Sequence, residues 1–290
     1  MKPRPNMPTA LIVSDRTCAA SAVKPLLADL PADSAHISVL VVGETEPLPA
    51  YAYGAEPYGP VIIPKDWSEH YEQAGAETAE RANEIESLLQ AEGLEGDVTA
   101  SYAEPALVSD IVASRAALSD IAFLHRSEAG QTTEQFNRLL AALLFDAPVG
   151  VVVNAASVAL VLSARRPLVA WDSSPQAVRA VHRALPILAQ ADEVTVVVFD
   201  GASRDDRAAG SDPGVDLATW LSRHGCTVAL QQCATAGQSV AEALLSKAAD
   251  TDADLLVMGG YGHSRLRQRL FGGTTKSILE QSKYPVMLAH

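Results

Sequence analysis

The chain has 290 residues, of which 48% are hydrophobic and 20% are charged, and 35 acidic residues against 22 basic ones give a net charge of −13. The apolar fraction excludes an intrinsically disordered chain, and the length allows two ordinary domains with sizeable cores. The excess of acid argues against sequence-independent nucleic-acid binding, which depends on neutralising phosphates.

Targeting and membrane signals are missing from the sequence. No apolar run approaches the roughly 18 residues of a membrane span. The basic start, Met1–Pro8, is followed by only four apolar residues before Ser14, which is too short for a signal-peptide core. Three cysteines without metal-ligand spacing favour a reducing compartment. We therefore expect a cytoplasmic protein with no membrane partner.

The charge is unevenly divided along the chain. Residues 1–156 carry 9 basic and 22 acidic residues, whereas residues 157–290 carry 13 of each. Between Leu255 and Leu279 there are four bases and no acid. These bases are Arg265, Arg267, Arg269 and Lys276. If the chain binds an anion, this stretch is the first place to look.

Four segments recur in the same order, as strand, helix, strand and terminal strand. They are 11–15, 108–115, 119–124 and 147–153 in the first copy and 168–172, 240–247, 253–258 and 284–289 in the second. The chain therefore reads as two copies of one domain, 1–156 and 165–290, joined near Asn154–Arg166. The spacing between copies falls from 157 to 134 residues, so the first copy has about 23 extra residues. We place them in a proline-rich loop around Glu44–Asp66.

The second copy alternates strands and helices. After a strand at 168–171, Ser173 or Ser174 caps a helix that has Pro175 in its first turn. Pro186 should bend this helix or mark its weak point. Its apolar face should comprise Val178, Val181, Leu185 and Leu188. The further strands are expected at 194–199, 226–230, 255–258 and 286–289, and the further helices at 215–224, 239–249 and 274–282. Continuous apolar strands predict an α/β fold with two similar five-stranded parallel sheets covered by helices on both faces.

Two features of the second copy fall where ligands bind in such folds, beyond the carboxyl ends of strands where strand order reverses. Asp172 follows the first strand. Gly259–Gly262 follow the fourth, and Gly272–Thr275 open the next helix. Glycines allow close approach and a helix N-terminus favours an anion, so a phosphate or polyphosphate fits. Three simpler interpretations stay open: Asp172 as a helix cap, the glycines as turn residues, and the arginines as a solvated face.

Motifs for catalysis fail on inspection. The frames of the phosphate-binding P-loop, the dinucleotide fingerprint and the Gly-x-Ser-x-Gly nucleophile elbow are absent from the sequence. His263 and Ser264 are neighbours, but no third residue is placed to orient them. We predict no catalytic residue and no metal ligand.

The glycine spacing resembles that of a known family, the universal stress proteins in their tandem two-domain form. Its nucleotide-binding members carry Gly, two residues, Gly, nine residues, then Gly followed by Ser or Thr. Gly259, Gly262 and Gly272 have this spacing, but Gly273 stands at the hydroxyl position and Thr274 comes one place late.

The resemblance implies a Rossmann-like fold of the adenine nucleotide alpha hydrolase type. It also implies that the second copy binds ATP, with Mg²⁺, or a related adenine nucleotide. In the family the aspartate contacts adenine, and the glycine loop holds ribose and phosphates. The implied site residues are Asp172, Met258, Gly259, Gly262, His263, Gly272, Gly273 and Thr274.

The first copy keeps the aspartate, as Asp15, but not the glycine loop. Residues 125–133 have lost the pattern, and Glu128 and Glu134 stand where phosphates would lie. We therefore expect no nucleotide in the first copy. The resemblance predicts a stress-response sensor or regulator. Two alternatives are a structural or partner-binding stress protein with a vestigial site, and a slow ATPase.

The terminal strands predict how the copies assemble. Val149–Val153 and Val286–Ala289 are short and apolar, and an exposed apolar edge tends to pair. In single-domain relatives such strands are expected to pair in a homodimer. We expect them to pair antiparallel within this chain, forming an intramolecular pseudo-dimer. A further homodimer is left open.

Overall fold

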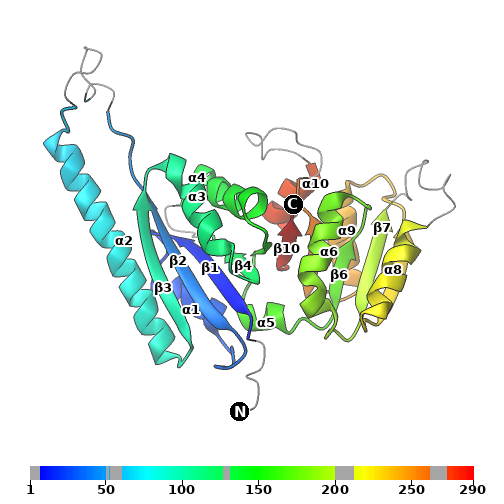
Figure 1. The fold of residues 1–290 in the computed structure, drawn as a ribbon. Helices are drawn as coiled ribbons and strands as arrows, with labels where there is room; N and C mark the ends of the chain where they lie inside the picture. The colour runs from blue at the N-terminus through cyan, green and yellow to red at the C-terminus, as the bar shows by residue number, and fades with distance from the viewer. Residues whose placement is uncertain (1–6, 50–51, 53–60, 127–130, 200–211, 262–272) are drawn as a thin grey trace.

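The computed structural model describes residues 7–49, 52, 61–126, 131–199, 212–261 and 273–290. These residues form one ten-stranded sheet in the order β3-β2-β1-β4-β5-β10-β9-β6-β7-β8 (Figure 1). The strands are β1 Thr9–Asp15, β2 His36–Glu44, β3 Gly96–Ala103, β4 Ile121–Leu124, β5 Gly150–Val153, β6 Pro167–Ala170, β7 Val194–Phe199, β8 Val228–Cys233, β9 Leu255–Gly259 and β10 Val286–Ala289. We call β1–β5 with their helices the first half and β6–β10 with theirs the second half.

The two halves have the same strand order and meet at one seam. Neighbouring strands within each half are parallel. At the seam β10 runs antiparallel to β5, with Val286 opposite Val153 and Leu288 opposite Val151. The sequence predicted this pairing, and the C-terminus accordingly lies at the centre of the molecule (Figure 1).

Helices cover both faces of the sheet. On one face the apolar core joins α1 Ala20–Leu27, α2 Lys65–Ala91, α5 Val158–Leu162, α6 Pro175–Leu188 and α8 Pro213–Arg223. On the other face it joins α3 Pro105–Ala116, α4 Thr133–Ala141, the π-helical turn η2 Ala142–Asp146, α9 Val240–Asp250 and α10 Gly273–Gln281. Ile12 of β1 points into the first core, and Leu11 and Val13 point into the second. Because both faces are covered, the strands are continuous apolar runs, as the sequence indicated.

Helix α6 begins as predicted but buries a different face. The Ser174 hydroxyl accepts a hydrogen bond from the Ala177 N–H at 3.1 Å, and Pro175 is the first helical residue. Val178 is 38% exposed, so its assignment to the apolar face was wrong. Small side chains lie against the sheet instead, and they let the helix pack closely. The buried residues are Ala177, Ala180, Val181, Ala184, Ile187 and Leu188.

Two other predictions need correction. Most of the extra length of the first half lies in a helix and not in a loop, since α2 has 27 residues whereas its counterpart α8 has 11. The connection before α2, 45–64, is only seven residues longer than 200–212 before α8. The strand expected at 226–230 runs from Val228 to Cys233, because Cys226 still closes the turn after α8 through a bond from its N–H to the Leu221 carbonyl.

No helix in the described parts of the chain is both long enough and apolar enough to cross a membrane.

Candidate functional site

The second half has its strand-order reversal between β6 and β9. The chain leaves β6 toward β7 on one side, while β9 lies on the other side. Ala170 pairs with Met258, so Asp172 and Gly260 extend beyond the same edge of the sheet. This is where ligands bind in open parallel sheets. The structure therefore brings Asp172, Met258 and Gly259 together.

Asp172 shapes the loop between β6 and α6 and does not cap the helix. Its Oδ1 accepts a hydrogen bond from the Ser174 N–H at 3.0 Å, and Ser173 between them has φ 63°. Among the described residues, Oδ2 has no hydrogen-bond partner, and the side chain is exposed. The capping interpretation of Asp172 was therefore wrong, since Ser174 is the cap. One carboxylate oxygen is left to accept a donor from a ligand.

Gly259 lets α6 approach the end of β9. A Cβ atom built on Gly259 would lie 2.6 Å from the backbone nitrogen of Ala177 and 2.9 Å from the carbonyl carbon of Gln176. Any side chain would push the first turn of α6 away from the strand. This glycine therefore holds the helix beside the Asp172 loop.

The residues after Gly259 are tied to α10 and to the chain end. Tyr261 donates its N–H to the Thr275 hydroxyl oxygen at 3.4 Å, and Gly260 donates to the Ala289 carbonyl at 2.9 Å. His290 Nδ1 lies 3.0 Å from the Gly260 carbonyl oxygen. These bonds bring the start of α10 to the same edge as Asp172.

Tyr261 forms part of this edge and was missed by sequence reasoning. Its side chain is buried, its φ is 56°, and burial raises its pKa to about 12, with the Glu280 carboxylate acting in the same direction. Phe145, from the first half, lies with its ring centroid 6.2 Å from that of Tyr261 and 4.5 Å from that of His290. The loop of the second half thus rests partly on the first half.

The start of α10 shows why a glycine stands before Thr274. Gly273 has φ 69°, a backbone conformation that favours glycine, and a Cβ there would meet no atom of the described residues within 4 Å. Thr274 is half-buried, and Lys276 Nζ lies 3.8 Å from a Glu280 oxygen. The predicted residues Gly262, His263 and Gly272, and the bases Arg265, Arg267 and Arg269, lie outside the described residues.

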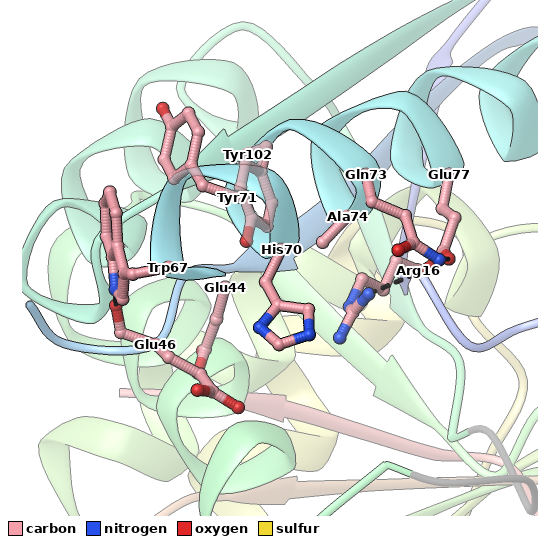
Figure 2. A pocket seen from close by; sticks show the side chains of 10 residues that line it. All are labelled: Arg16, Glu44, Glu46, Trp67, His70, Tyr71, Gln73, Ala74, Glu77 and Tyr102. Atoms are coloured by element: carbon pink, nitrogen blue, oxygen red, sulfur yellow. Dashed lines mark hydrogen bonds and ion pairs between the residues drawn. The ribbon is translucent and has the colours of Figure 1, made fainter. Parts of the chain in front are cut away.

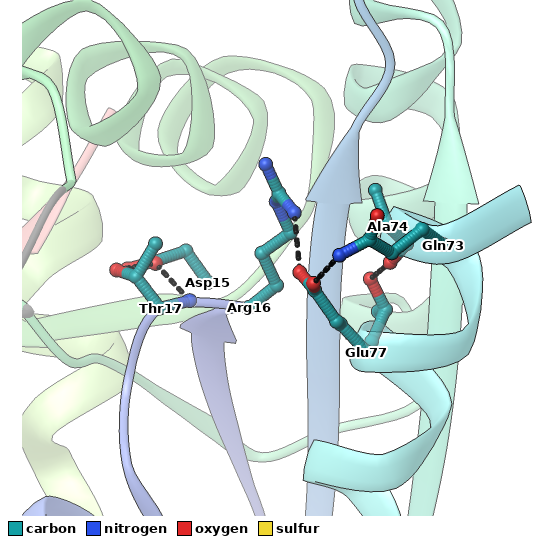
Figure 3. Close-up of polar contacts among 7 residues, drawn as sticks. Asp15, Arg16, Thr17, Gln73, Ala74 and Glu77 are labelled. Carbon is teal, nitrogen blue, oxygen red and sulfur yellow. Dashed lines mark hydrogen bonds and ion pairs between the residues drawn. The ribbon is translucent and has the colours of Figure 1, made fainter. Parts of the chain in front are cut away.

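The corresponding aspartate of the first half is buried. Asp15 Oδ1 accepts hydrogen bonds from the Thr17 N–H, at 2.7 Å, and from the Thr17 hydroxyl (Figure 3). Asp15 is 5% exposed, and its Oδ2 has no partner among the described residues. The side chain is therefore turned into the protein, unlike that of Asp172.

Ion pairs lie beside the reversal point of the first half. Arg138 of α4 lies 3.1 Å from Glu44, at the end of β2, and 3.2 Å from Glu134. Burial raises the pKa of the Glu44 carboxyl, and Arg138 opposes this. Thr132 begins α4 with a capping box to Gln135, where the second half has glycines. Glu128 lies outside the described residues.

A cavity of about 340 Å³ opens between α2 and the ends of β1–β3 (Figure 2). Sequence reasoning missed it because the residues around Glu44–Asp66 were assigned to a loop. The sequence feature that could have indicated this cavity is the pair Trp67 and Tyr71, which are one helical turn apart. In the structure their rings are stacked, with centroids 5.3 Å apart. Within the described ranges, no group of three or more His, Cys, Asp or Glu side chains could hold a metal ion.

Comparison with known proteins finds a family model that matches the second half and solved structures with the fold of the whole chain. Residues 164–290 match the model of the universal stress protein family. A solved universal stress protein from Archaeoglobus fulgidus DSM 4304 has a TM-score of 0.65 and 18% identity, over 98% of this chain and 96% of its own. A protein of unknown function from Pseudomonas aeruginosa PAO1 has a TM-score of 0.54 and 14% identity, over 97% and 92%. At these identities the likeness shows the fold.

A shorter universal stress protein, solved in complex with cAMP, is 23% identical over 44% of this chain and 98% of its own, with a TM-score of 0.36. None of the curated proteins compared with the chain matches it.

Proposed function

We propose that this chain, whose residues 164–290 belong to the universal stress protein family, binds an adenine nucleotide in its second half and acts as a stress-response regulator or sensor. The observation that carries the proposal is the meeting of three elements at the β6–β9 reversal point. These elements are the exposed carboxylate of Asp172, the end of β9 at Gly259, and the start of α10 at Gly273.

Each element can supply what an adenine nucleotide needs. The spare oxygen of Asp172 can accept a hydrogen bond from the exocyclic amine of adenine. The first N–H groups of α10 and the Thr274 hydroxyl can donate to phosphate oxygens, and the helix dipole favours their negative charge. The described residues offer no carboxylate set for Mg²⁺, so the phosphates and water would hold that ion.

One observation favours a second candidate, a partner-binding protein with a vestigial nucleotide site. Gly273 lacks the hydroxyl that the family's motif carries after its third glycine, and Thr275 already uses its hydroxyl oxygen on Tyr261. Under this hypothesis the loop geometry survives without a ligand.

Calorimetry on the full chain with ATP, AMP and cAMP, combined with an assay for phosphate release, separates the hypotheses. We expect ATP to bind more tightly than AMP, and affinity to fall as salt rises, because the attraction between solvent-exposed charges is screened over about 8 Å at physiological ionic strength. Binding without turnover supports a sensor, steady phosphate release supports a slow ATPase, and no binding supports the vestigial site.

Two aspartate variants locate the site. Asp172→Ala should weaken nucleotide binding about tenfold, as expected for losing a hydrogen bond to a charged group. Asp110→Ala, an exposed aspartate of α3 in the first half, is the matched control and should leave affinity unchanged. Equal affinities in both variants would remove the β6–β9 edge as the binding site.

We also place the protein in the cytoplasm, as a monomer held by its own seam. Cell fractionation followed by immunoblotting tests the compartment, and light scattering of the purified chain tests whether it forms a further homodimer.

A further inference from the structure

The cavity beside α2 is separate from the nucleotide edge and belongs to the first half. Its walls come from the inner side of α2 and from the residues that end β1, β2 and β3. The second half has a helix of only 11 residues in place of α2. The cavity is therefore a feature of the longer helix and has no assigned role.

Aromatic rings form one wall of the cavity. Trp67 stacks on Tyr71, and Tyr71 lies with its ring centroid 5.0 Å from that of Tyr102 (Figure 2). Gly43 leaves space for the Tyr102 ring, because a Cβ at Gly43 would lie 2.6 Å from it. The wall presents π-electron faces to the cavity.

The charged groups around the cavity leave an excess of acid. Arg16 is paired with Glu77 at 3.0 Å, and Glu77 also accepts a hydrogen bond from Gln73 at 3.0 Å (Figure 3). Glu44 is paired with Arg138, as described above. Among the described residues, the Glu46 carboxylate has no hydrogen bond or ion pair, although its backbone carbonyl accepts from Trp67 Nε1 at 3.2 Å.

Both acidic and basic groups around the cavity act on the Tyr102 hydroxyl. Burial raises the pKa of its hydroxyl, Arg16 opposes the shift, and the carboxylates of Glu46 and Glu77 add to it. Residues 1–156 as a whole carry 22 acidic and 9 basic residues, so the field of this half is negative.

We propose that this cavity binds a small organic cation, an alkylammonium or alkylguanidinium ion, with its charge near Glu46 and its carbon chain against Trp67 and Tyr71. Aromatic faces and an uncompensated carboxylate together select a cation that also carries apolar surface. A bare metal ion fits less well, because it prefers several oxygen ligands and gains little from the rings. Figure 2 shows the His70 side chain between those of Glu46 and Arg16.

The probes are 1,4-diaminobutane, which carries ammonium groups, and agmatine, which adds a guanidinium group, with neutral 1,4-butanediol as the matched control. Binding to the full chain is measured by calorimetry and by the change in tryptophan fluorescence. We expect both cations to bind and the diol not to bind. The tighter of the two identifies the preferred head group.

Three variants assign the binding. Glu46→Gln, at an exposed residue, should weaken binding about tenfold, and Trp67→Leu should weaken it about fivefold and remove the fluorescence change. Glu86→Gln makes the same charge change on an exposed part of α2 outside the cavity and should change affinity less than about twofold.

Three results would overturn the proposal. They are no binding of either cation, equal binding of the diol, and an equal loss in the Glu46 and Glu86 variants, which would indicate only the general field of the first half. A far-ultraviolet circular dichroism spectrum of each variant shows whether it is folded. Because the nucleotide edge lies in the other half, loss of cation binding leaves the nucleotide proposal standing, and the reverse is also true.

Discussion

The two halves share one strand order, yet they differ at the carboxyl end of their first strand. In the first half Asp15 is buried and bonded to Thr17, and Arg138 joins Glu44 to Glu134 nearby. In the second half Asp172 is exposed, and α10 begins at Gly273, which has a positive φ of 69°. A repeated fold therefore supplies a position for a ligand, while the local side chains decide whether that position is open.

The largest expected effect is on stability, and it tests the β5–β10 seam that joins the two halves. Met287 is fully buried in β10, opposite Val152. Met287→Asp should lower the free energy of unfolding by about 4 kcal/mol, because it places an unpaired charge in the core. Urea denaturation followed by tryptophan fluorescence should show both halves losing stability together.

The control is Met287→Leu, which should cost less than about 1.5 kcal/mol. An aspartate variant as stable as the unmodified protein would show that the strands do not meet.

The next effect should be confined to the second half. Gly259→Val should lower the free energy of unfolding by about 2 kcal/mol, because its side chain would collide with the first turn of α6. Nucleotide binding should be lost as well. Gly260→Ala, whose nearest neighbour atom would be 3.6 Å away, should change stability by less than about 0.5 kcal/mol. Similar behaviour of the two variants in a denaturant titration would contradict the packing role of Gly259.

A smaller effect should separate the two aspartates. Asp15→Ala should cost about 1 kcal/mol, because it removes the hydrogen bonds to Thr17, and nucleotide affinity should not change. Asp172→Ala should leave stability within about 0.5 kcal/mol and weaken only the nucleotide. Thermal unfolding and calorimetry on the same samples measure both quantities. If the two variants behave alike, the contrast between the halves is wrong.

The smallest effect concerns pH and lies far from neutrality. Burial raises the pKa of Tyr261 to about 12, above the value of about 10 in an unfolded chain. The folded state therefore holds this proton more tightly, so the contribution to stability is complete below pH 10 and is lost as pH rises toward 12. Absorbance near 295 nm should show a tyrosine that ionises near pH 12 and that Tyr261→Phe removes. A normal titration of that residue would mean that the Tyr261 ring is solvated.

The parts of the fold that could be predicted depend on local sequence. The continuous apolar strands, the Ser174 cap and the pairing of β5 with β10 followed from periodicity, capping chemistry and the cost of a free edge. The length of α2 did not, because Ala and Glu are its commonest residues and few large apolar positions mark a buried face. Aligning apolar segments therefore assigned the extra residues to the preceding loop.

The sequence indicated which edge of the sheet to propose as the site, but not its detail. Asp172 follows the first strand of the second copy, and the glycine-rich segment follows its fourth strand. The burial of Tyr261 depends on Phe145, which is 116 positions earlier in the chain, and the need for Gly259 depends on how closely α6 packs. Such tertiary contacts leave no periodic pattern in a single sequence.

The β5–β10 seam has a consequence for how the protein responds to dilution. Two separate chains joined through such strands would dissociate as their concentration fell, because their association follows mass action. Here residues 154–166 connect the partners, and short connections of this kind correspond to effective concentrations of about a millimolar. The ten-stranded sheet should therefore stay assembled at any copy number in the cell, and Phe145 should support the Tyr261 loop even when the protein is scarce.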